Sequence, residues 1–456
     1  MSAKTALRAA NQSPLLHGFS DLAALQRNGA CVIERGEGIY VFDSTGRRYM
    51  EGNSGLWNVV LGYDNARLKQ ALRRQMERLP AYHGFFGRIS DVAFELAERL
   101  RAIAPMPTSK VFFTNSGSEA NDTAAKMLWM VALGEGQPKR RKFISRINAY
   151  HGVTAMTANL TGKPYNKAFG LPTGEVLFAE CPHYWRHGRA QESEAEFTQR
   201  LARDLEALIA REGADTIAGF FAEPVMGAGG VIVPPEGYFQ AIQPVLKRHA
   251  IPLVADEVIC GFGRTGKLWG SQTFGLEPDI LVASKCITAG YFPMGAVLLS
   301  PEMSDRVDHA SRAYGEFPHG FTTGAHPLGA AVALEAIDIL VGDDYPGRVA
   351  RLAPRLQDGL KRLAQHPMVG EARGIGFMGA LEIVADKTSK APFPPDRDVS
   401  ERIARVAYDK GLIIRPLGSA VIVAPPFIIT EQEIDDMLAI IADTLDSVGA
   451  AVAGPR

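Results

Sequence analysis

The stretch DILVASKCITAGYFPMGAVLLS (residues 279–300) decides the fold, because two apolar segments flank a turn that begins with one lysine. Both segments, 279–285 and 294–300, are rich in the small and branched apolar residues that are typical of buried β-strands. Lysine is among the residues least often buried, unless it is paired or used in chemistry. The position of Lys285 at a strand end therefore requires an explanation from the rest of the chain.

Similar apolar segments alternate with helical patterns between about residues 90 and 300. The start of KVFFTNSGSEAND (110–122) predicts a strand, as do IAGFFAEPV (217–225) and IPLVADEV (251–258). DVAFELAERLRAI (91–103) and FQAIQPVLKRHA (239–250) predict amphipathic helices. Continuous apolar strands separated by helices predict an α/β fold with a mostly parallel sheet that is covered on both faces.

The polar residues of interest follow the ends of these strands. They are Ser116, Ser118, Glu223, Asp256 and Lys285. Because ligands of parallel sheets bind beyond the carboxyl ends of the strands, we expect these side chains to converge on one site.

The two ends of the chain predict a second, smaller α+β unit. The segments FMGALEIV (377–384) and AVIVAPP (420–426) are strand-like, and a closing amphipathic helix begins with Thr430 as its N-cap. GIYVFDSTGRRYMEG (38–52) predicts a hairpin with its turn at Asp43–Gly46, which packs with this unit. The expected limits of the N-terminal segment, the large domain and the small domain are 1–60, 61–330 and 331–456.

The composition is that of an ordinary soluble globular protein. The chain has 456 residues, 46% hydrophobic and 22% charged, and this length favours two or more packed units. A net charge of -1 provides no general attraction to nucleic acid or to an anionic membrane. The four cysteines lie far apart and form no CxxC pair, which favours a reducing compartment. The first residues lack the features of a secretory signal, and no run of about 18 apolar residues occurs. We therefore expect a cytoplasmic protein without nucleic-acid or membrane partners.

The segment TNSGSEAND (114–122) is typical of a strand that leads into a helix through Ser-Gly-Ser. Gly117 allows close approach of the backbone, Ser116 and Ser118 offer hydroxyl donors, and the first turn of the helix presents N–H groups that suit a phosphate. The alternative is an ordinary helix start capped by one of the serines. The segment is neither a P-loop nor a nucleophile elbow, which disfavours an NTPase and an α/β-hydrolase.

Asp256 and Lys285 form a second pattern at two strand ends. In VADEVICGFGRTG (254–266), a carboxylate that ends a buried strand is costly unless it meets a cation. The functional interpretation pairs Asp256 with a protonated ring nitrogen of a cofactor, and the alternative is a salt bridge to an arginine or a helix cap. A lysine in an apolar pocket has a lowered pKa, and its neutral amine can form a Schiff base. A lone lysine is more often simply exposed, but Asp256 at the same sheet edge favours the chemical interpretation. No strand–GxGxxG–helix unit occurs, so a dinucleotide site is disfavoured.

Two further segments have both a chemical and a structural interpretation. In NAYHGVTAMT (148–157), Tyr150 can stack on a flat ring or pack in a loop. CPHYWRHG (181–188) contains one cysteine and two histidines, which are residue types that bind zinc. Because a full set of ligands is missing and the segment is expected to be a surface loop, we predict no metal site.

Together these motifs resemble the class III (ω-type) pyridoxal-phosphate aminotransferases of fold type I. The segments SGSEAND, AYHG, GVIVPPEGYF (230–239), DEVICGFGRTG, the strand-end lysine and HGFTTGAHP (319–327) occur in the order and approximate spacing of that family. The resemblance extends from SGLWNVVLGY (54–63) to the C-terminal helix. It implies a large domain with a mostly parallel seven-stranded sheet flanked by helices, and a smaller α+β domain built from both termini.

The resemblance also implies a role for each matching residue. Lys285 would hold pyridoxal 5′-phosphate as a Schiff base and move the proton during amino transfer. Asp256 would keep the pyridine nitrogen protonated, so that the ring can take up electrons. Tyr150 would stack on the ring, and Val258 would pack on its other face.

The remaining residues of the implied cofactor site come from several segments. They are Ser116, Gly117, Ser118, His151, Glu223 and Thr322. Gly117 and Ser118 would bind the phosphate, and Glu223 would support the hydrogen bonds of the site. Thr322 would reach the phosphate of a neighbouring subunit, which implies a homodimer or a tetramer of two dimers.

The implied substrate pocket is aromatic. Trp57, Phe85 and Phe86 lie on segments that line the pocket in the family, beside Tyr150. Arg415 matches an arginine that pairs with a substrate carboxylate and swings aside for a plain amine. A planar guanidinium suits a carboxylate, and the alternative is a structural ion pair between domains. The lining is similar to the amine:pyruvate subgroup rather than to the ornithine or 4-aminobutyrate subgroups.

The chain departs from the family pattern near the pocket. Cys286 stands where many relatives carry glycine, and Thr323-Gly324 stands where Tyr-Ser is frequent. These departures leave the cofactor site intact and leave the preferred amine open.

The resemblance implies an ω-transaminase that moves an amino group from an amine or ω-amino acid to a keto acid, with pyruvate as the expected acceptor, by a ping-pong mechanism. The alternatives are an aminomutase or decarboxylase on the same fold, a 2-oxoglutarate-linked aminotransferase, and a cofactor-binding regulator. The presence of both Lys285 and Asp256 argues against the regulator.

Overall fold

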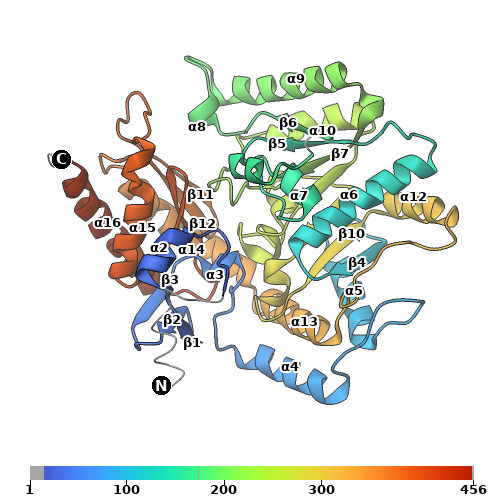
Figure 1. Ribbon diagram of the computed structural model, residues 1–456, viewed down its shortest axis with the longest axis horizontal. Coiled ribbons are helices and arrows are strands. Elements are labelled where there is room, and N and C mark those ends of the chain that lie inside the picture. The colour runs from blue at the N-terminus through green and yellow to red at the C-terminus, as the bar shows by residue number, and fades with distance from the viewer. Residues whose placement is uncertain (1–14, 173, 454–456) are drawn as a thin grey trace.

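The computed structural model describes residues 15–172 and 174–453, which form a larger α/β part and a smaller part built from both ends of the chain (Figure 1). In Figure 1 the smaller part, in blue and in orange to red, lies to the left of the larger part. The expectation about a secretory signal falls mainly on residues 1–14, which lie outside the described residues. Within the described residues, no helix is both long and apolar enough to cross a membrane.

The larger part is built on a seven-stranded sheet with the order β4-β10-β9-β8-β7-β5-β6. The strands are β4 Lys110–Thr114, β5 Lys142–Arg146, β6 Val176–Ala179, β7 Ile217–Ala222, β8 Leu253–Asp256, β9 Ile280–Ala283 and β10 Gly295–Leu299. Strand β10 runs antiparallel to both β4 and β9, whereas every other pair of neighbours is parallel. The predicted sheet is therefore confirmed.

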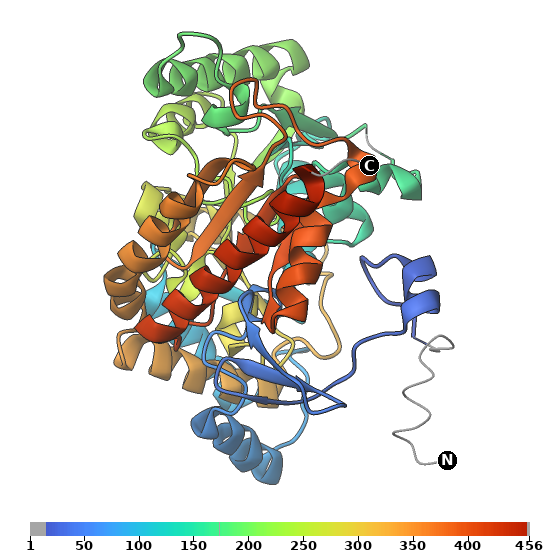
Figure 2. The ribbon, with the colours of Figure 1, turned by 90° about the vertical axis from the view of Figure 1, so that its left-hand side faces the viewer.

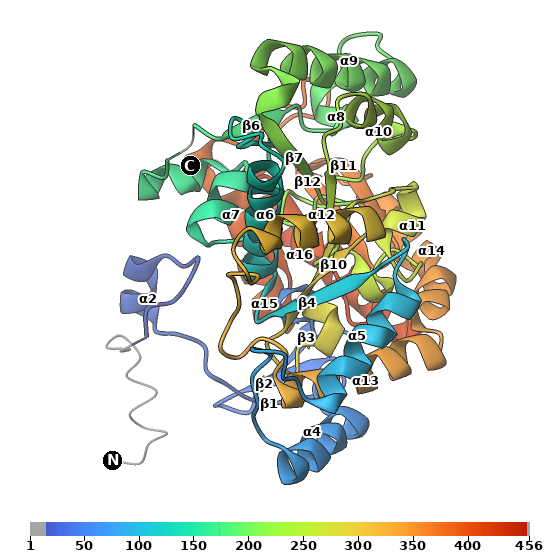
Figure 3. The same ribbon diagram turned by 90° about the vertical axis from the view of Figure 1, so that its right-hand side faces the viewer.

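Helices cover both faces of this sheet, because alternate strand residues point to opposite sides. Phe221 and Val282 pack with α6 and α12. Phe220 packs on the other face with α9 and α10, and Leu281 packs there with α5 and α13. Figure 3 shows α9 and α10 at one end of the sheet and α5 and α13 at the other. The bounds are α5 Asp91–Ile103, α6 Gly117–Gly134, α9 Glu194–Glu212, α10 Tyr238–Arg248, α12 Pro301–Arg312 and α13 Pro327–Gly342.

Further helices and turns complete the larger part. Helix α4 packs against α13. The remaining α-helices are α3 Ser54–Trp57, α4 Ala66–Arg78, α7 Ala155–Leu160, α8 Tyr184–His187 and α11 Gly270–Phe274. The 3₁₀ turns are η2 Pro164–Phe169, η3 Ala214–Thr216, η4 Gly261–Gly263 and η5 Lys285–Thr288.

The smaller part contains two four-stranded sheets, β11-β12-β15-β14 and β1-β2-β3-β13. The strands are β1 Ile33–Glu37, β2 Tyr40–Asp43, β3 Arg48–Glu51, β11 Val369–Ile375, β12 Met378–Ile383, β13 Leu412–Ile413, β14 Arg415–Leu417 and β15 Ala420–Val423. The helices and turn are α2 Leu22–Asn28, α14 Tyr345–Leu363, η6 Pro395–Arg397, α15 Val399–Asp409 and α16 Glu431–Ala453. Figure 2 faces this part and shows α15 and α16 side by side.

The predicted N-terminal hairpin is present as β2 and β3. In its turn, the Asp43 carboxylate accepts hydrogen bonds from the backbone N–H groups of Thr45 and Arg47 at 2.9 and 3.0 Å. Met50 of β3 pairs in parallel with Leu412 of β13, so the hairpin packs with the C-terminal unit as expected. The limits given above for the three domains stay a prediction.

Candidate active site

Four polar segments follow strand ends at one edge of the large sheet. Glu223 directly follows β7, Asp256 ends β8, and Lys285 lies two residues beyond β9. Strand β4 points the same way as β9, because β10 is antiparallel to both, so its end brings α6 to this edge. The predicted convergence is therefore present for these segments.

Asp256 is buried, with 4% of its surface exposed, and its carboxylate accepts three hydrogen bonds. Oδ2 accepts from Asn121 Nδ2 at 2.7 Å and lies 2.8 Å from Nδ1 of His151. Oδ1 accepts from the backbone N–H of Val258 at 3.1 Å. Among the described residues, Nε2 of His151 is buried without a hydrogen-bond partner. The carboxylate is thus held in one orientation by neutral amides and one imidazole, and no arginine pairs with it in the described chain.

The amine of Lys285 makes no hydrogen bond or ion pair with any other residue in the described part of the chain. Its backbone has a φ of 44°, which is rare for a residue other than glycine and is typical of functional sites. Burial lowers the pKa of the amine below its usual 10.5, and the charges of Asp256 and Glu223 oppose this effect. A neutral amine beside a fixed carboxylate can act as a nucleophile and as a base.

The start of α6, at residues 116–118, presents donors that suit an anion, and we call it the anion cup. The backbone N–H groups of its first turn have no partner within the helix. A Cβ on Gly117 would lie 2.9 Å from Cγ2 of Val258, so only glycine leaves the backbone open here. Ser116 caps the helix, since its hydroxyl accepts from Glu119 N at 3.2 Å, and Ser118 Oγ accepts from Val153 N at 3.2 Å. The capped-helix alternative therefore holds for Ser116, and it does not exclude an anion on the same turn.

Glu223 positions the loop that carries Tyr150. Its carboxylate accepts from the backbone N–H of Tyr150 at 3.1 Å and of Gly227 at 3.0 Å. Burial raises the pKa of Glu223, while His151 and Arg146 lower it. Burial also raises the pKa of the Tyr150 hydroxyl, so this side chain stays neutral near the site.

Arg415 lies near Tyr150 and is half-buried. Its guanidinium makes no hydrogen bond or ion pair with any other described residue, so the alternative of an interdomain ion pair is not observed there. Burial lowers the pKa of its guanidinium, and Tyr150 and Tyr165 oppose this effect. A second cation, Lys163, was not found from the sequence. Burial also lowers the pKa of Lys163, beside Glu223 and Arg415.

Within a single chain, Trp57 lies apart from Phe85 and Phe86, the other aromatic residues expected in the pocket. Trp57 is buried, and its carbonyl oxygen lies 3.3 Å from Sγ of Cys286. Phe86 is 82% exposed. Phe85 packs against Gly320, where a Cβ would lie 2.6 Å from the phenyl ring, and Thr322 in the same loop is exposed.

The loop of Thr322 is tied to the start of α6. Thr323 Oγ1 donates to Asn115 Oδ1 at 2.8 Å. Phe86 and Thr322 are exposed and Phe85 is half-buried, and all three lie beside the anion cup. The carbonyl oxygen of Trp57 instead contacts Cys286, the residue that follows Lys285.

The segment 181–188 differs from the expected surface loop. Cys181 and His183 are buried, and His183 Nε2 lies 2.8 Å from the Glu371 carboxylate of the smaller part. Among residues 15–172 and 174–453, no group of three or more His, Cys, Asp or Glu side chains is arranged to hold a metal ion.

This donor set fits pyridoxal phosphate. A fixed carboxylate suits the protonated pyridine nitrogen, a lysine with a lowered pKa suits the aldehyde, and a helix start that only glycine keeps open suits the phosphate. The fold and the site thus define a fold type I pyridoxal-phosphate enzyme.

Comparisons with known proteins agree with this class. The family model of class-III aminotransferases matches residues 22–445. The crystal structure of an aminotransferase from Vibrio fluvialis in its PMP-bound form is 55% identical, with a TM-score of 0.95 over 96% of this chain and 97% of that chain. An omega-aminotransferase from Paracoccus denitrificans is 53% identical, with a TM-score of 0.96 over 99% of this chain and all of that chain. A mitochondrial gamma aminobutyrate transaminase of Solanum lycopersicum is 44% identical over 91% of this chain and 81% of its own length.

The chain therefore belongs to the class-III aminotransferase family. It is an enzyme that transfers amino groups between small molecules, and its cofactor is pyridoxal 5′-phosphate.

Proposed function

We propose that this transaminase takes the amino group of an amine or ω-amino acid, passes it to pyruvate and releases alanine in a ping-pong cycle. The observation that carries the proposal is Arg415, a guanidinium without a partner in the described chain, beside Tyr150. A free guanidinium can bind the carboxylate of a keto acid. The resemblance to the family places Trp57 in the pocket wall, and an aromatic wall suits an apolar amine substituent.

When bound, the cofactor supplies a conjugated ring that accepts the electron pair left on the substrate carbon after proton loss. Asp256 would hold the ring nitrogen, and the backbone of Gly117 and Ser118 would hold the phosphate. Nζ of Lys285 takes the proton from the amine-bearing carbon, because burial keeps a neutral fraction of this amine available. In the second half of the cycle, Arg415 orients the keto acid and Lys285 returns a proton to its carbon.

A homodimer is part of the proposal, with Thr322 completing the phosphate site of the partner. Large apolar side chains beside the site residues are mostly exposed in a single chain: Leu56 61%, Phe86 82% and Val153 60%. Such exposure next to a site supports a covering subunit.

We propose a cytoplasmic location. The four cysteines are free among the described residues, and three of them are buried, which supports a reducing compartment. Several curated relatives are named as mitochondrial, so cell fractionation is the test.

The test of the reaction is a two-stage absorbance experiment on the purified holoenzyme. We expect 1-phenylethylamine alone to bleach the bound-cofactor band, and pyruvate then to restore it. Recovery only with 2-oxoglutarate would keep the transaminase and overturn pyruvate as acceptor. A band that no amine or amino acid bleaches would favour a mutase or decarboxylase.

A second candidate donor is 4-aminobutyrate. The curated relatives named as gamma aminobutyrate transaminases are 42 to 44% identical, and a free Arg415 can also bind the carboxylate of this donor. Bleaching by 4-aminobutyrate but not by 1-phenylethylamine would favour it.

A further inference from the structure

The segment that carries Trp57 has a strained backbone. Ser54 and Trp57 have positive φ angles of 49° and 69°, in a region that residues other than glycine rarely adopt. Such a conformation persists only where surrounding contacts hold it. Because the proposed function places Trp57 in the pocket wall, the contacts that hold this segment also determine the shape of that wall.

Two groups of the larger part donate to the carbonyl oxygen of Trp57. Nη2 of Arg264 lies 3.3 Å from this oxygen and 3.4 Å from Oγ of Ser54. Sγ of Cys286 lies 3.3 Å from the same oxygen. Burial raises the pKa of the Cys286 thiol, so the thiol keeps its proton and can donate it.

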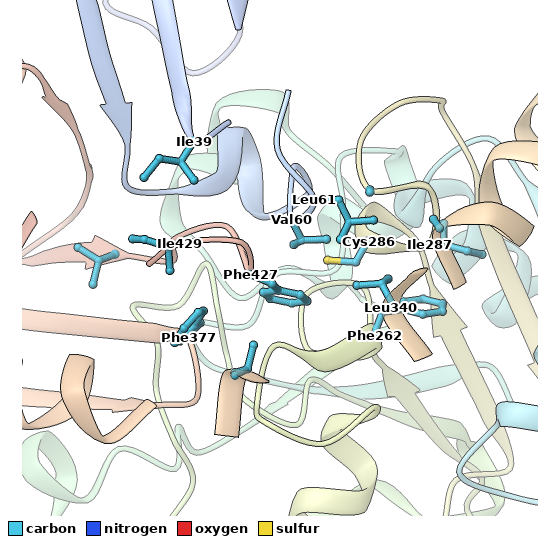
Figure 4. Packing of buried hydrophobic residues seen from close by; sticks show 14 of the residues in the cluster. Ile39, Val60, Leu61, Phe262, Cys286, Ile287, Leu340, Phe377, Phe427 and Ile429 are labelled. Atoms are coloured by element: carbon cyan, nitrogen blue, oxygen red, sulfur yellow. The ribbon is translucent and has the colours of Figure 1, made fainter. Parts of the chain in front are cut away.

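Arg264 is fully buried, and no carboxylate pairs with it in the described chain. Its Nη1 donates to the carbonyl oxygens of Phe377 and Pro425 at 3.2 and 2.8 Å. Its guanidinium carbon lies 4.7 Å from the ring centroid of Phe427. Figure 4 shows Cys286, Phe427 and Phe377 in the apolar cluster where the two parts of the molecule meet. A guanidinium here is costly compared with an apolar residue, so its use as a donor to backbone oxygens indicates a positioning role.

We propose that Arg264 and Cys286 are positioning residues that fix the backbone of Trp57, and with it the place of the indole, and thereby set which amine substituents the pocket accepts. The inference rests on the proposed function, because it concerns the amine donor of that reaction. Cys286 directly follows Lys285 on η5, so one turn carries both the reacting amine and the anchor of the pocket wall. The spacing between the two is thus fixed locally.

Three variants and one control test the anchor. Cys286→Ala removes the donor, and Cys286→Ser keeps one. Arg264→Lys keeps the charge but lacks the planar fork, which reaches Trp57 and Ser54 through Nη2 while Nη1 donates to the carbonyl oxygens of Phe377 and Pro425. Cys260→Ala is the matched control, because Cys260 is equally buried in the apolar cluster of Trp57, but its Sγ lies 3.7 Å from the Val225 oxygen instead.

The first readout is hydrogen exchange of the peptide that covers residues 53–60 in the cofactor-free protein. We expect exchange to be about fivefold faster in Cys286→Ala and in Arg264→Lys, since each loses a hydrogen bond to this segment. Cys286→Ser and Cys260→Ala should match the wild type. Unchanged exchange in Cys286→Ala, or an equal effect in Cys260→Ala, would overturn the anchor.

The second readout is the ratio of kcat/KM for 1-phenylethylamine to kcat/KM for isopropylamine. We expect this ratio to change about fivefold in Cys286→Ala, mainly through KM, and to return to the wild-type value in Cys286→Ser. An unchanged ratio in Cys286→Ala would overturn the role in selectivity. If the wild type transaminates neither amine, the proposed function fails, and the exchange experiment still decides whether the anchor exists.

Discussion

Two opposing effects act on the pKa of the Lys285 amine. Burial lowers its pKa and Asp256 raises it, with a net lowering below 10.5. Only the neutral amine adds to an aldehyde. We therefore expect the rate at which the cofactor-free protein takes up pyridoxal phosphate to rise with pH, with a midpoint below 10.5. Stopped-flow absorbance measures this rate.

The same experiment on Asp256→Asn gives the sign of the carboxylate effect. Because the Asp256 charge stabilises the protonated amine, its removal should move the midpoint to lower pH. A midpoint that moves to higher pH, or a wild-type midpoint at or above 10.5, would contradict this account of Lys285.

Arg415 is expected to serve the keto acid rather than the plain amine. In Arg415→Met we expect kcat/KM for pyruvate to fall roughly 30- to 150-fold, which corresponds to about 2–3 kcal/mol for a charge-assisted hydrogen bond. The half-reaction with 1-phenylethylamine should stay close to the wild-type rate. Arg351→Met, at an exposed position, is the control. Equal losses in both half-reactions would show that Arg415 is structural.

The sequence identified those site residues that lie at or just beyond the end of a predicted strand. Lys285 and Asp256 each end an apolar segment, so the shared sheet edge brought them together in the prediction. Arg264 and Lys163 escaped prediction, because their neighbours Trp57, Phe377 and Glu223 are far away in the sequence. No local pattern marks a side chain that binds distant backbone oxygens.

The strands of the sheet differ in how clearly their sequences mark them. The apolar strands β7, β8, β9 and β10 were predicted, but β5 and β6 were not. Strand β5 reads KFISR, and its Ser145 and Arg146 are fully buried. Nη2 of Arg146 donates to the Glu223 carbonyl oxygen at 2.6 Å. A buried strand with polar residues lacks the apolar pattern on which the prediction depends.

The loop after β5 packs tightly on the start of α6. Gly152 has a φ of 138°, and a Cβ there would lie 2.5 Å from Ser118 Oγ. We expect Gly152→Ala to weaken pyridoxal phosphate binding by about 1–3 kcal/mol, or roughly 5- to 150-fold. The reason is that the new methyl group forces Ser118 to move away from the anion cup. Absorbance titration of the cofactor-free protein measures this affinity.

The control is Gly342→Ala at the end of α13, where a Cβ would meet no atom within 4 Å. Unchanged cofactor affinity in Gly152→Ala would mean that the cup tolerates the shift.

At the scale of the whole molecule, the two-part architecture was predictable because the sequence patterns of the two parts differ. Alternating apolar strands and helices mark the large part, and the hairpin at 38–52 carries its own turn signal. The antiparallel direction of β10 was not predicted, because an apolar strand has the same pattern in either direction.

The proposed dimer makes a prediction about hybrid assemblies. Lys285→Ala and Thr322→Ala chains should each be weakly active alone, because one lacks the amine and the other lacks a phosphate donor. Co-expressed, they should form hybrid dimers with one intact site, which pairs Lys285 of one chain with Thr322 of the other. Activity above either parent, measured on tagged and separated hybrids, is the expected result. Hybrids no more active than the parents would mean that Thr322 serves its own chain.

Arg264 has a consequence for the order in which the chain folds. Its guanidinium donates to the carbonyl oxygens of Phe377 and Pro425. Until these two oxygens are in place, burial of the guanidinium costs it the hydrogen bonds that it makes with water. During synthesis, a ribosome has made Lys285 and Asp256 long before it reaches these late residues. The emerging chain can therefore assemble the central sheet early, but the wall at Trp57 closes only when nearly the whole polypeptide has left the exit tunnel. Truncation near the C-terminus should thus spare the sheet and leave the pocket unfinished.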